Sequence, residues 1–349
     1  MTAGVFVGVD SGGTRTNVDV VIDDAEGGRR SSSYEVSESL SGALAPSLIP
    51  HALGRILAPL LARLDDLAAD GLPLYIWFSA AGYSPWTRDE FNVALQDLGP
   101  SVAGGAVHSI GVANDAVSLL LGSRANGIVI AGTGSSCIVK SEDGHLHQAG
   151  GHEWVACDYG SGFWIGLKAI RAAYRDYEAG TDSVLLQRLR QVYGIRPDDN
   201  RGLIAKLRDL AVADPNMKKE IARFAASVCD AAERGDVPAQ NIVKEEAEDL
   251  ADVTAGLLRR QFTASELTQG VGLVECGSLL GNTLYRTSFE AQIELRLRSG
   301  IEQRAAIAWQ RVTTGGAACI RLARDLAEPG AIELLRSEVA FRPSIVRIR

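Results

Sequence analysis

Val7-Gly-Val-Asp-Ser-Gly-Gly-Thr-Arg-Thr-Asn17 is the stretch that decides the fold. Apolar residues before it and at 18–22 predict two strands, and the glycines between them allow the backbone a tight turn. At the tip of such a hairpin, backbone N–H groups and hydroxyls can bind phosphate oxygens, and Asp10 can hold Mg²⁺ directly or through water. The candidate phosphate-binding residues are Gly12, Gly13, Thr14 and Thr16. Taken alone, the pattern is also that of a plain turn.

Length and composition predict a soluble protein with about two domains. The chain has 349 residues, of which 46% are hydrophobic and 22% charged. Its net charge of −8 argues against nucleic acid as a partner, because a phosphate backbone attracts basic surfaces. No stretch approaches the ~18 consecutive apolar residues of a membrane span, and the start lacks the features of a signal peptide. We therefore expect a cytoplasmic protein with neither a membrane nor a nucleic-acid partner.

The cysteines are scattered, odd in number and never in C-x-x-C spacing. This pattern indicates neither a disulfide framework nor a structural zinc or iron–sulfur site. We expect buried, reduced thiols. The five residues are Cys137, Cys157, Cys229, Cys276 and Cys319.

The first third of the chain alternates short strands and helices, which predicts an α/β domain. Strands are expected near residues 31–36 and 74–79, and helices over about 44–70 and from about residue 87. The next strand ends in Asn114 and Asp115, directly before an apolar helical run. Asp115 therefore lies at the carboxyl end of a strand, where α/β folds commonly place ligands. An aspartate in this position could equally cap its helix.

A second set of the same parts begins at residue 127. Gly127–Lys140 predicts a strand, a Gly-Thr-Gly-Ser turn and a returning strand, and a third strand follows near residues 145–149. Two such hairpins can face each other across a cleft and hold one polyphosphate from both sides. Helical periodicity then runs to about residue 261. Further strands are expected at 270–278 and 292–297, and a final helix at 318–326 after a glycine turn.

Five motifs follow one another along the chain. They are Val9-Asp-Ser-Gly-Gly-Thr-Arg-Thr16, Asn114-Asp115, Ile130-Ala-Gly-Thr-Gly-Ser-Ser136, Asp158-Tyr-Gly-Ser-Gly-Phe-Trp-Ile-Gly166 and Glu275-Cys-Gly-Ser278. Their order and spacing resemble those of the N-acetylglucosamine kinases and the BadF/BadG/BcrA/BcrD ATPases, members of the hexokinase, Hsp70 and actin superfamily. The resemblance implies two ribonuclease H-like ATPase domains around a central cleft. It places them at residues 1–115 and 116–349, with a helical insertion over about 163–262 and a last helix that packs back on the first domain.

The resemblance implies that ATP with Mg²⁺ is the phosphate donor. It assigns the first hairpin to the β- and γ-phosphates, with Asp10 on the Mg²⁺ side. From the second hairpin it assigns Gly132, Thr133 and Gly134 to the phosphates. It assigns Gly277 and Ser278, helped by Gly315 and Gly316, to the adenosine side.

The resemblance also implies a sugar as the acceptor. Asp115 matches the catalytic aspartate, which accepts the proton of the sugar hydroxyl that attacks the γ-phosphorus. On the sugar side it places Asn114, Ser135, Ser136 and Asp158, of which Asp158 would bind sugar hydroxyls. An ordinary helix entry is the alternative for Asp158.

The acceptor loop departs from the family pattern. The family carries Gly-Gly-Trp-Gly and Gly-Asp-Glu-Gly-Ser here, whereas this chain has Gly150-Gly-His-Glu-Trp-Val-Ala-Cys-Asp-Tyr-Gly-Ser161, and the family's asparagine near residue 37 is missing. Gly151, His152 and Glu153 remain candidate substrate contacts, with a local salt bridge or a plain surface position as the alternatives for the last two. Because buried polar groups select their ligand strongly, these changes leave the acceptor open. We expect N-acetylglucosamine or glucosamine, or a related hexose or cyclitol.

Two other functions fit this superfamily. One is a BadF-type ATPase that activates a partner enzyme, although such proteins hold an iron–sulfur cluster through paired cysteines and no such pair occurs here. The other is a sugar or nucleotide sensor that keeps the fold without catalysis, although Asp10, Asp115 and both hairpins are kept. By analogy with its relatives, the protein could form a homodimer.

Overall fold

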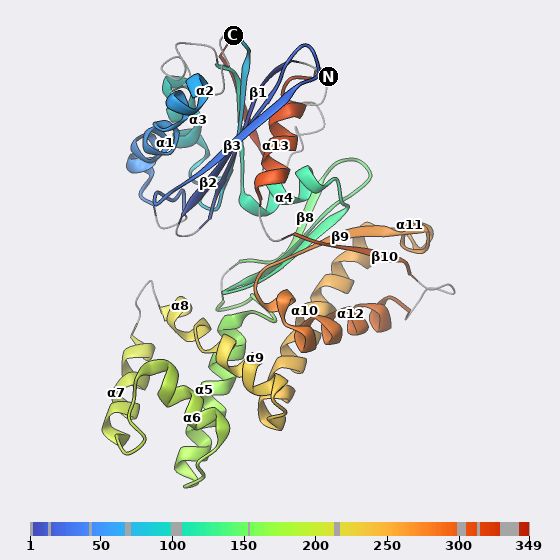
Figure 1. The fold of residues 1–349 in the computed structure, drawn as a ribbon. Coiled ribbons are helices and arrows are strands. Elements are labelled where there is room, and N and C mark those ends of the chain that lie inside the picture. The colour runs from blue at the N-terminus through green and yellow to red at the C-terminus, as the bar shows by residue number, and fades with distance from the viewer. Residues whose placement is uncertain are drawn as a thin grey trace. The chain divides into compact units, whose positions relative to one another are not determined.

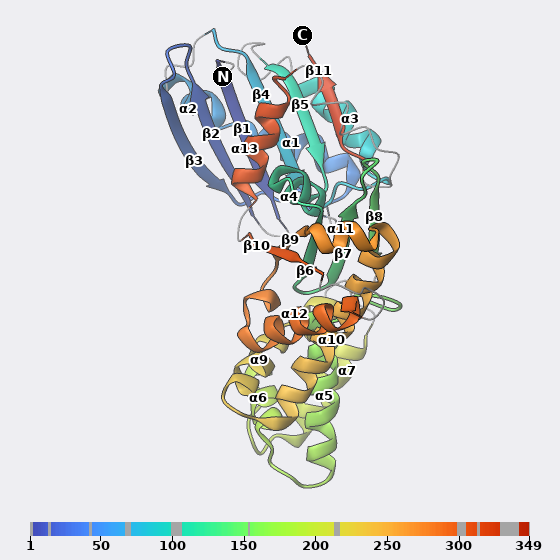
Figure 2. The same ribbon diagram turned by 90° about the vertical axis from the view of Figure 1, so that its right-hand side faces the viewer.

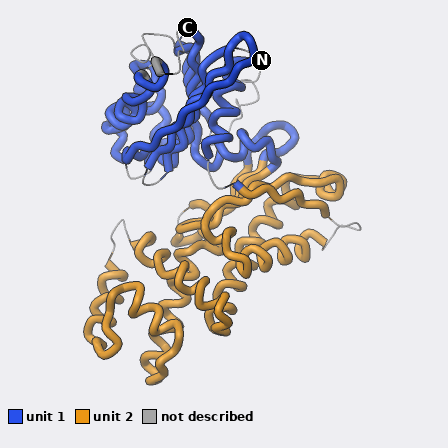
Figure 3. Tube along the Cα trace, in the orientation of Figure 1, with its two compact units in different colours: residues 1–126, 140–146, 312–349 blue, residues 127–139, 147–311 orange. Residues whose placement is uncertain are grey.

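The computed structural model describes residues 3–12, 15–41, 44–66, 71–98, 107–152, 154–212, 217–298, 305–312, 315–328 and 342–348. The chain divides into two compact units (Figure 3). Unit 1 consists of Met1–Asn126, Lys140–Leu146 and Val312–Arg349, and unit 2 of Gly127–Val139 and His147–Arg311. The expected boundary at residue 115 falls inside unit 1, whose last segment comes from the far end of the chain.

The sheet of unit 1 has the strand order β11-β5-β4-β1-β2-β3. The predicted opening hairpin is present, since β1 pairs antiparallel with β2, and β2 with β3. Strands β1, β4 and β5 run parallel, so their carboxyl ends lie at the same edge. The strands are β1 (Gly4–Ser11), β2 (Thr16–Asp23), β3 (Arg29–Val36), β4 (Leu74–Ala80), β5 (Val107–Ala113) and β11 (Ser344–Arg347).

Helices cover both faces of this sheet (Figures 1 and 2). One face carries α1 (Ile49–Leu57), α2 (Leu60–Asp66) and α3 (Arg88–Leu98), whose apolar side chains share a core with the alternate residues of β1 and β2. The other face carries α4 (Asp115–Ser123) and α13 (Gly316–Asp325). Glycines allow α13 to approach closely: a Cβ on Gly8 would lie 2.8 Å from the Cβ of Cys319, and one on Gly122 would lie 2.6 Å from that of Ala318.

The sheet of unit 2 repeats the same plan. Its order, β10-β9-β6-β7-β8, matches the unit 1 order β5-β4-β1-β2-β3 strand for strand. Again the first two strands are antiparallel, and the later strands add in parallel to the first. The prediction of an α/β fold with a repeated opening is confirmed. The strands are β6 (Gly127–Ala131), β7 (Ser135–Lys140), β8 (Leu146–Gly150), β9 (Val271–Cys276) and β10 (Ile307–Arg311).

The helices of unit 2 lie mainly between β8 and β9 in the chain, as predicted. The predicted strand at 292–297 is wrong, because this segment belongs to α12. Its buried residues recur every fourth position, at Tyr285, Phe289, Ile293 and Leu297, and so form one face of a helix. The helices are α5 (Gly162–Glu178), α6 (Val184–Tyr193), α7 (Asn200–Ala211), α8 (Met217–Ala222), α9 (Ala225–Glu233), α10 (Val237–Gln261), α11 (Ala264–Gln269) and α12 (Thr283–Arg298).

Two expectations from composition can be compared with the structure. Cys137, Cys229 and Cys319 are buried free thiols, but the expectation of burial is wrong for Cys157 and Cys276, which are partly exposed. Within the described ranges, no helix combines the length and apolar character needed to cross a membrane.

Candidate active site

The tip of the first hairpin is only partly described. Gly13 and Thr14 lie outside the described residues. The Gly12 N–H donates to the Arg15 carbonyl oxygen at 3.2 Å, which closes the turn between β1 and β2. The Gly12 carbonyl oxygen accepts from the Ser39 hydroxyl at 2.5 Å. The chain after β3 therefore supports the tip that was predicted to bind phosphate.

Thr16 has a different place from the one predicted. Its side chain is fully buried, and its hydroxyl donates to the Glu38 carbonyl oxygen at 2.7 Å. The Ser11 hydroxyl lies 2.7 Å from that of Thr16 and accepts from the Leu40 N–H at 2.7 Å. These bonds hold residues 38–40, which follow β3, against the hairpin. The Thr16 hydroxyl thus holds the turn in shape and does not point out from its tip.

Asp10 is the second-last residue of β1 and lies against the amino end of α13. Its Oδ2 accepts from the Gly315 N–H at 2.8 Å, and the Ser79 hydroxyl lies 3.5 Å from its Oδ1. A Cβ on Gly315 would lie 2.6 Å from this carboxylate, so only glycine fits. Gly316 packs just as closely against Asp19. The two glycines predicted to serve the adenosine side therefore bring a helix amino end, with its partial positive charge, to two carboxylates.

Asp115 is the first residue of α4, one position beyond Asn114, which caps the helix. The Ala116 N–H donates to Oδ1 of Asn114 at 3.1 Å and to Oδ1 of Asp115 at 2.8 Å. Asp10 pairs with Ser79, and Ser79 with Ala113, so Asp10 and the start of α4 share one edge of the sheet. Burial raises the pKa of the Asp115 carboxyl, and the negative charge of Asp10 raises it further. A carboxylate with a raised pKa is a stronger general base.

The second predicted phosphate turn lies on the amino end of α5. The carbonyl oxygen of Gly132 accepts from the Gly162 N–H at 2.7 Å, and that of Thr133 from the Phe163 N–H at 3.2 Å. Within the turn, the Gly132 N–H donates to Gly134 O at 2.9 Å. A Cβ on Gly132 would meet nothing within 4 Å, so this side of the turn is open. The hydroxyl of Ser135, which follows Gly134, donates to Tyr159 O at 2.6 Å.

Asp158 lies directly against this turn. It has a left-handed backbone, with φ 59°, and its side chain is only 2% exposed. A Cβ on Gly134 would lie 3.0 Å from Asp158 Oδ2. The same Oδ2 forms an ion pair with Lys218 Nζ at 2.6 Å. Lys218 belongs to the helical insertion and was not found from the sequence, where nothing sets it apart from the other surface lysines of this region.

Two buried side chains, Glu246 and Tyr285, hold the loop that carries Asp158. The Gly160 N–H donates to Oε2 of Glu246 at 3.0 Å, and the Tyr285 hydroxyl donates to Gly160 O at 2.6 Å. Lys168 Nζ lies 2.6 Å from Oε1 of Glu246. Burial raises the pKa of Glu246, and the Lys168 charge opposes that rise. Both polar groups of the Gly160 backbone are thus held, which stabilises the left-handed conformation two residues earlier.

The predicted acceptor loop begins with two left-handed glycines, Gly150 (φ 74°) and Gly151 (φ 70°). A Cβ on Gly151 would lie 3.0 Å from the Ser136 hydroxyl oxygen, so these two predicted contacts are adjacent. Gln148, which the sequence analysis missed, donates to Ser136 Oγ at 3.3 Å and to Gly150 O at 2.9 Å. His152 is exposed, and Glu153 lies outside the described residues.

Gly277 and Ser278 follow β9. Gly277 has φ 108° and lies so close to the Ala131 carbonyl at the end of β6 that a Cβ would collide with it. Ser278 is exposed beside it. The turn therefore lies next to the strand that leads into the second phosphate turn.

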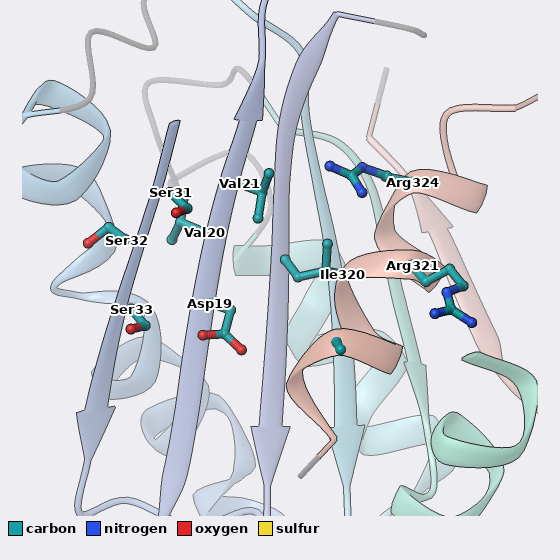
Figure 4. A pocket seen from close by; sticks show the side chains of 10 residues that line it. Asp19, Val20, Val21, Ser31, Ser32, Ser33, Ile320, Arg321 and Arg324 are labelled. Carbon is teal, nitrogen blue, oxygen red and sulfur yellow. The ribbon is translucent and has the colours of Figure 1, made fainter. Parts of the chain in front are cut away.

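A groove of about 520 Å³ lies on the outer part of the unit 1 sheet (Figure 4). It is formed by β2, β3 and α13, with Asp19 on the strand side and Arg321 and Arg324 on the helix side. Of the predicted phosphate and sugar contacts that the structure describes, none lines it. We therefore do not assign the nucleotide or the acceptor to this groove.

Comparisons with known proteins show the family and the fold of the chain. An N-acetylmuramic acid/N-acetylglucosamine kinase from Clostridium acetobutylicum is 28% identical over 253 residues, which cover 70% of this chain and 76% of that protein. A protein assigned as an N-acetylglucosamine kinase from Chromobacterium violaceum superposes with a TM-score of 0.63 at 20% identity, covering 92% of this chain and 99% of that one. One with the same assignment from Porphyromonas gingivalis gives 0.62 at 17% identity, over 91% and 99%.

A ROK family glucokinase from Streptomyces griseus, solved with glucose and AMPPNP, gives a TM-score of 0.51 at 18% identity, over 93% of this chain and 99% of that one. At these identities, the structural likenesses show a shared two-domain sugar kinase fold. The family model for the BadF/BadG/BcrA/BcrD ATPases matches residues 7–301, which is most of the chain. The chain belongs to the BadF/BadG/BcrA/BcrD ATPase family.

Proposed function

We propose that this protein is an ATP-dependent kinase that phosphorylates a hydroxyl of an amino sugar. The observation that carries the proposal is the position of Asp115 in the first turn of α4, at the same carboxyl edge of the sheet as Asp10. The relative from Clostridium acetobutylicum, a kinase of N-acetylmuramic acid and N-acetylglucosamine, supports the acceptor class. N-acetylglucosamine and glucosamine are the first candidates, followed by related hexoses and cyclitols.

In this proposal, Asp115 is the general base. The acceptor hydroxyl oxygen attacks the γ-phosphorus while the bond between that phosphorus and the β,γ-bridging oxygen breaks, which releases ADP. The hydroxyl proton passes to the Asp115 carboxylate. Phosphoryl transfer needs little other covalent chemistry from the protein, because catalysis consists mainly of positioning and charge stabilisation.

Backbone N–H groups of the two glycine turns would bind the phosphates. Gly12, Gly13 and Thr14 would contribute from the first hairpin, and Gly132, Thr133 and Gly134 from the second. The open side of Gly132 gives a phosphate oxygen access to that backbone. Gly277 and Ser278 would lie on the adenosine side.

Asp10 fits the requirements of Mg²⁺. Its carboxylate supplies the hard oxygen ligand that Mg²⁺ prefers. Burial raises the pKa of Asp19 and of Asp115, and the charge on Asp10 raises both further, so a cation there would relieve repulsion. Within the described residues, no group of three or more His, Cys, Asp or Glu side chains could hold a metal ion. Such a sparse protein ligand set suits an ion that keeps several waters and binds phosphates. When bound, Mg²⁺ would neutralise charge on the phosphates.

The acceptor would bind to the loop region of unit 2. Asp158 can accept hydrogen bonds from sugar hydroxyls, and Ser136 and Gly151 lie together on the neighbouring strand and loop. Asn114, Ser135, His152 and Glu153 complete the proposed set. Because Ser135 and Asn114 already make local hydrogen bonds, we expect them to orient the backbone around the acceptor.

A coupled ADP-release assay over amino sugars, hexoses and cyclitols tests the proposal. Wild-type protein should phosphorylate at least one amino sugar, and Asp115→Asn should lose turnover while keeping its affinity for AMPPNP. Turnover of a hexose or cyclitol alone would support kinase activity but contradict an amino sugar as the acceptor. A wild-type protein that binds ATP but phosphorylates none of the panel would reject the kinase in favour of a sensor or an activating ATPase.

A further inference from the structure

We propose that Lys218 belongs to the phosphate site, where its ammonium group neutralises Asp158 and attracts the γ-phosphoryl group bound at the Gly132–Gly134 turn. The inference rests on the proposed function for the identity of that turn. It adds a residue that neither the family motifs nor the glycine turns point to.

The geometry places a positive and a negative charge against the same stretch of backbone. A Cβ on Gly134 would lie 3.0 Å from Asp158 Oδ2 and 3.3 Å from Lys218 Nζ. The two groups are themselves 2.6 Å apart, with Asp158 2% and Lys218 27% exposed. A phosphoryl group carried by this turn would therefore come within a few ångströms of both charges.

The electrostatics explain why the lysine is needed. A lone buried carboxylate beside the turn would repel a phosphate, and such repulsion is strong where water is largely excluded. Paired with an ammonium, the same carboxylate can bind an acceptor hydroxyl without opposing the phosphate. Lys218 thus allows Asp158, which would bind the acceptor, to lie next to the Gly132–Gly134 turn, which would bind phosphate.

Packing fixes Lys218 in this position. Gly166 of α5 lies so close to the Ile221 carbonyl that a Cβ would collide with it, so α8 lies directly on α5. The Tyr193 hydroxyl donates to Glu220 O at 2.8 Å, which ties the same short helix to α6. Because the turn also lies on the amino end of α5, Lys218 and the turn share one rigid support.

The test measures nucleotide affinity in variants that remove the charge of Lys218 alone or together with that of Asp158. Calorimetric titration with AMPPNP and ADP should show that Lys218→Met weakens AMPPNP at least about 10-fold, with a smaller effect on ADP, because a charge-assisted contact to the γ-phosphoryl group is lost. The double variant Lys218→Met/Asp158→Asn should recover part of that affinity, since it removes the repelling charge but does not restore the lost contact. Lys218→Arg should stay close to wild type. Lys219→Met, on the exposed side of the same helix, is the matched control.

Two results would overturn the inference: unchanged AMPPNP affinity in Lys218→Met, or a double variant as weak as the single one, which would show that Lys218 does not act by neutralising Asp158. Thermal melts of each variant show whether it is folded. Neither titration needs an acceptor, so failure of wild type to phosphorylate any sugar would reject the proposed function alone. Where a sugar is turned over, Lys218→Met should lower kcat at saturating acceptor, by about 10²-fold.

Discussion

At the scale of the residue, the pKa of Asp115 links its proposed catalytic role to the stability of the fold. Its folded-state pKa is raised, so between about 3.9 and that raised value the folded protein binds more protons than the unfolded chain. The free energy of unfolding therefore falls as the pH rises through this window. At neutral pH, the ionised form that the proposed mechanism requires is therefore the form that the fold disfavours.

We predict that Asp115→Asn lowers kcat at least about 100-fold and raises the melting temperature at neutral pH. The amide oxygen can still accept from the Ala116 N–H, and the uncharged side chain avoids the repulsion from Asp10. Melting curves at neutral pH and near pH 4 would check this, since the stability gain should shrink at the lower pH. A lower melting temperature at neutral pH would contradict it.

Glu275 gives a second prediction at this scale. Burial and the nearby negative charge of Glu290 raise its pKa to about 7, against the favourable charge of Arg286. Since the folded-state pKa is the higher one, the protonated carboxyl stabilises the fold below about pH 4.5, and this contribution is lost as the pH rises through about 7. Glu275→Gln should therefore raise the melting temperature near pH 8 more than near pH 5. An equal effect at both pH values, or the same trend in exposed Glu248→Gln, would argue against it.

At the scale of elements, α10 and α12 act on the acceptor loop through the backbone of Gly160. Tyr285→Phe removes one of the two bonds that hold this residue, and we expect the acceptor KM to rise several-fold because Asp158 loses its fixed position. The KM for ATP should change little. Loss of one buried hydrogen bond should also cost about 1 kcal/mol of stability. Steady-state kinetics of this variant beside Tyr177→Phe, a partly buried tyrosine of α5, would check the effect. Equal increases in both KM values would show general loosening instead.

The sequence predicts a helix or strand well where nearby residues determine it, and poorly where packing against distant residues determines it. The hairpins and the strand before Asp115 were predictable, because apolar strands, glycine turns and a polar end follow in direct succession. The segment at 292–297 was mispredicted because Gln, Ile, Glu, Leu, Arg and Leu alternate like a strand, and only the longer spacing from Tyr285 shows the helix. Lys218 and Glu246 reach the site through tertiary packing, which helical periodicity does not encode. The burial of Thr16 depends likewise on the distant Glu38 backbone.

At the scale of the whole molecule, the two units differ in which parts of the chain form them. Unit 2 is built almost entirely from residues between 127 and 311, whereas unit 1 is completed by α13 and β11. We predict that removing residues 312–349 speeds hydrogen exchange in β1 and β4, because α13 covers them. Exchange in β6 and α10 should stay near wild type. Equal loss of protection in both units would show that they fold as one.

The place of α13 in the chain has a consequence for synthesis on the ribosome. Strand β1 and Asp10 emerge early, but the Gly315 N–H that binds Asp10 emerges only after all of unit 2. Until then the face of β1 at Gly8 lacks the helix that packs on it in the folded protein. If the proposed function holds, competence to bind a nucleotide would therefore arise late, only after α13 has joined β1.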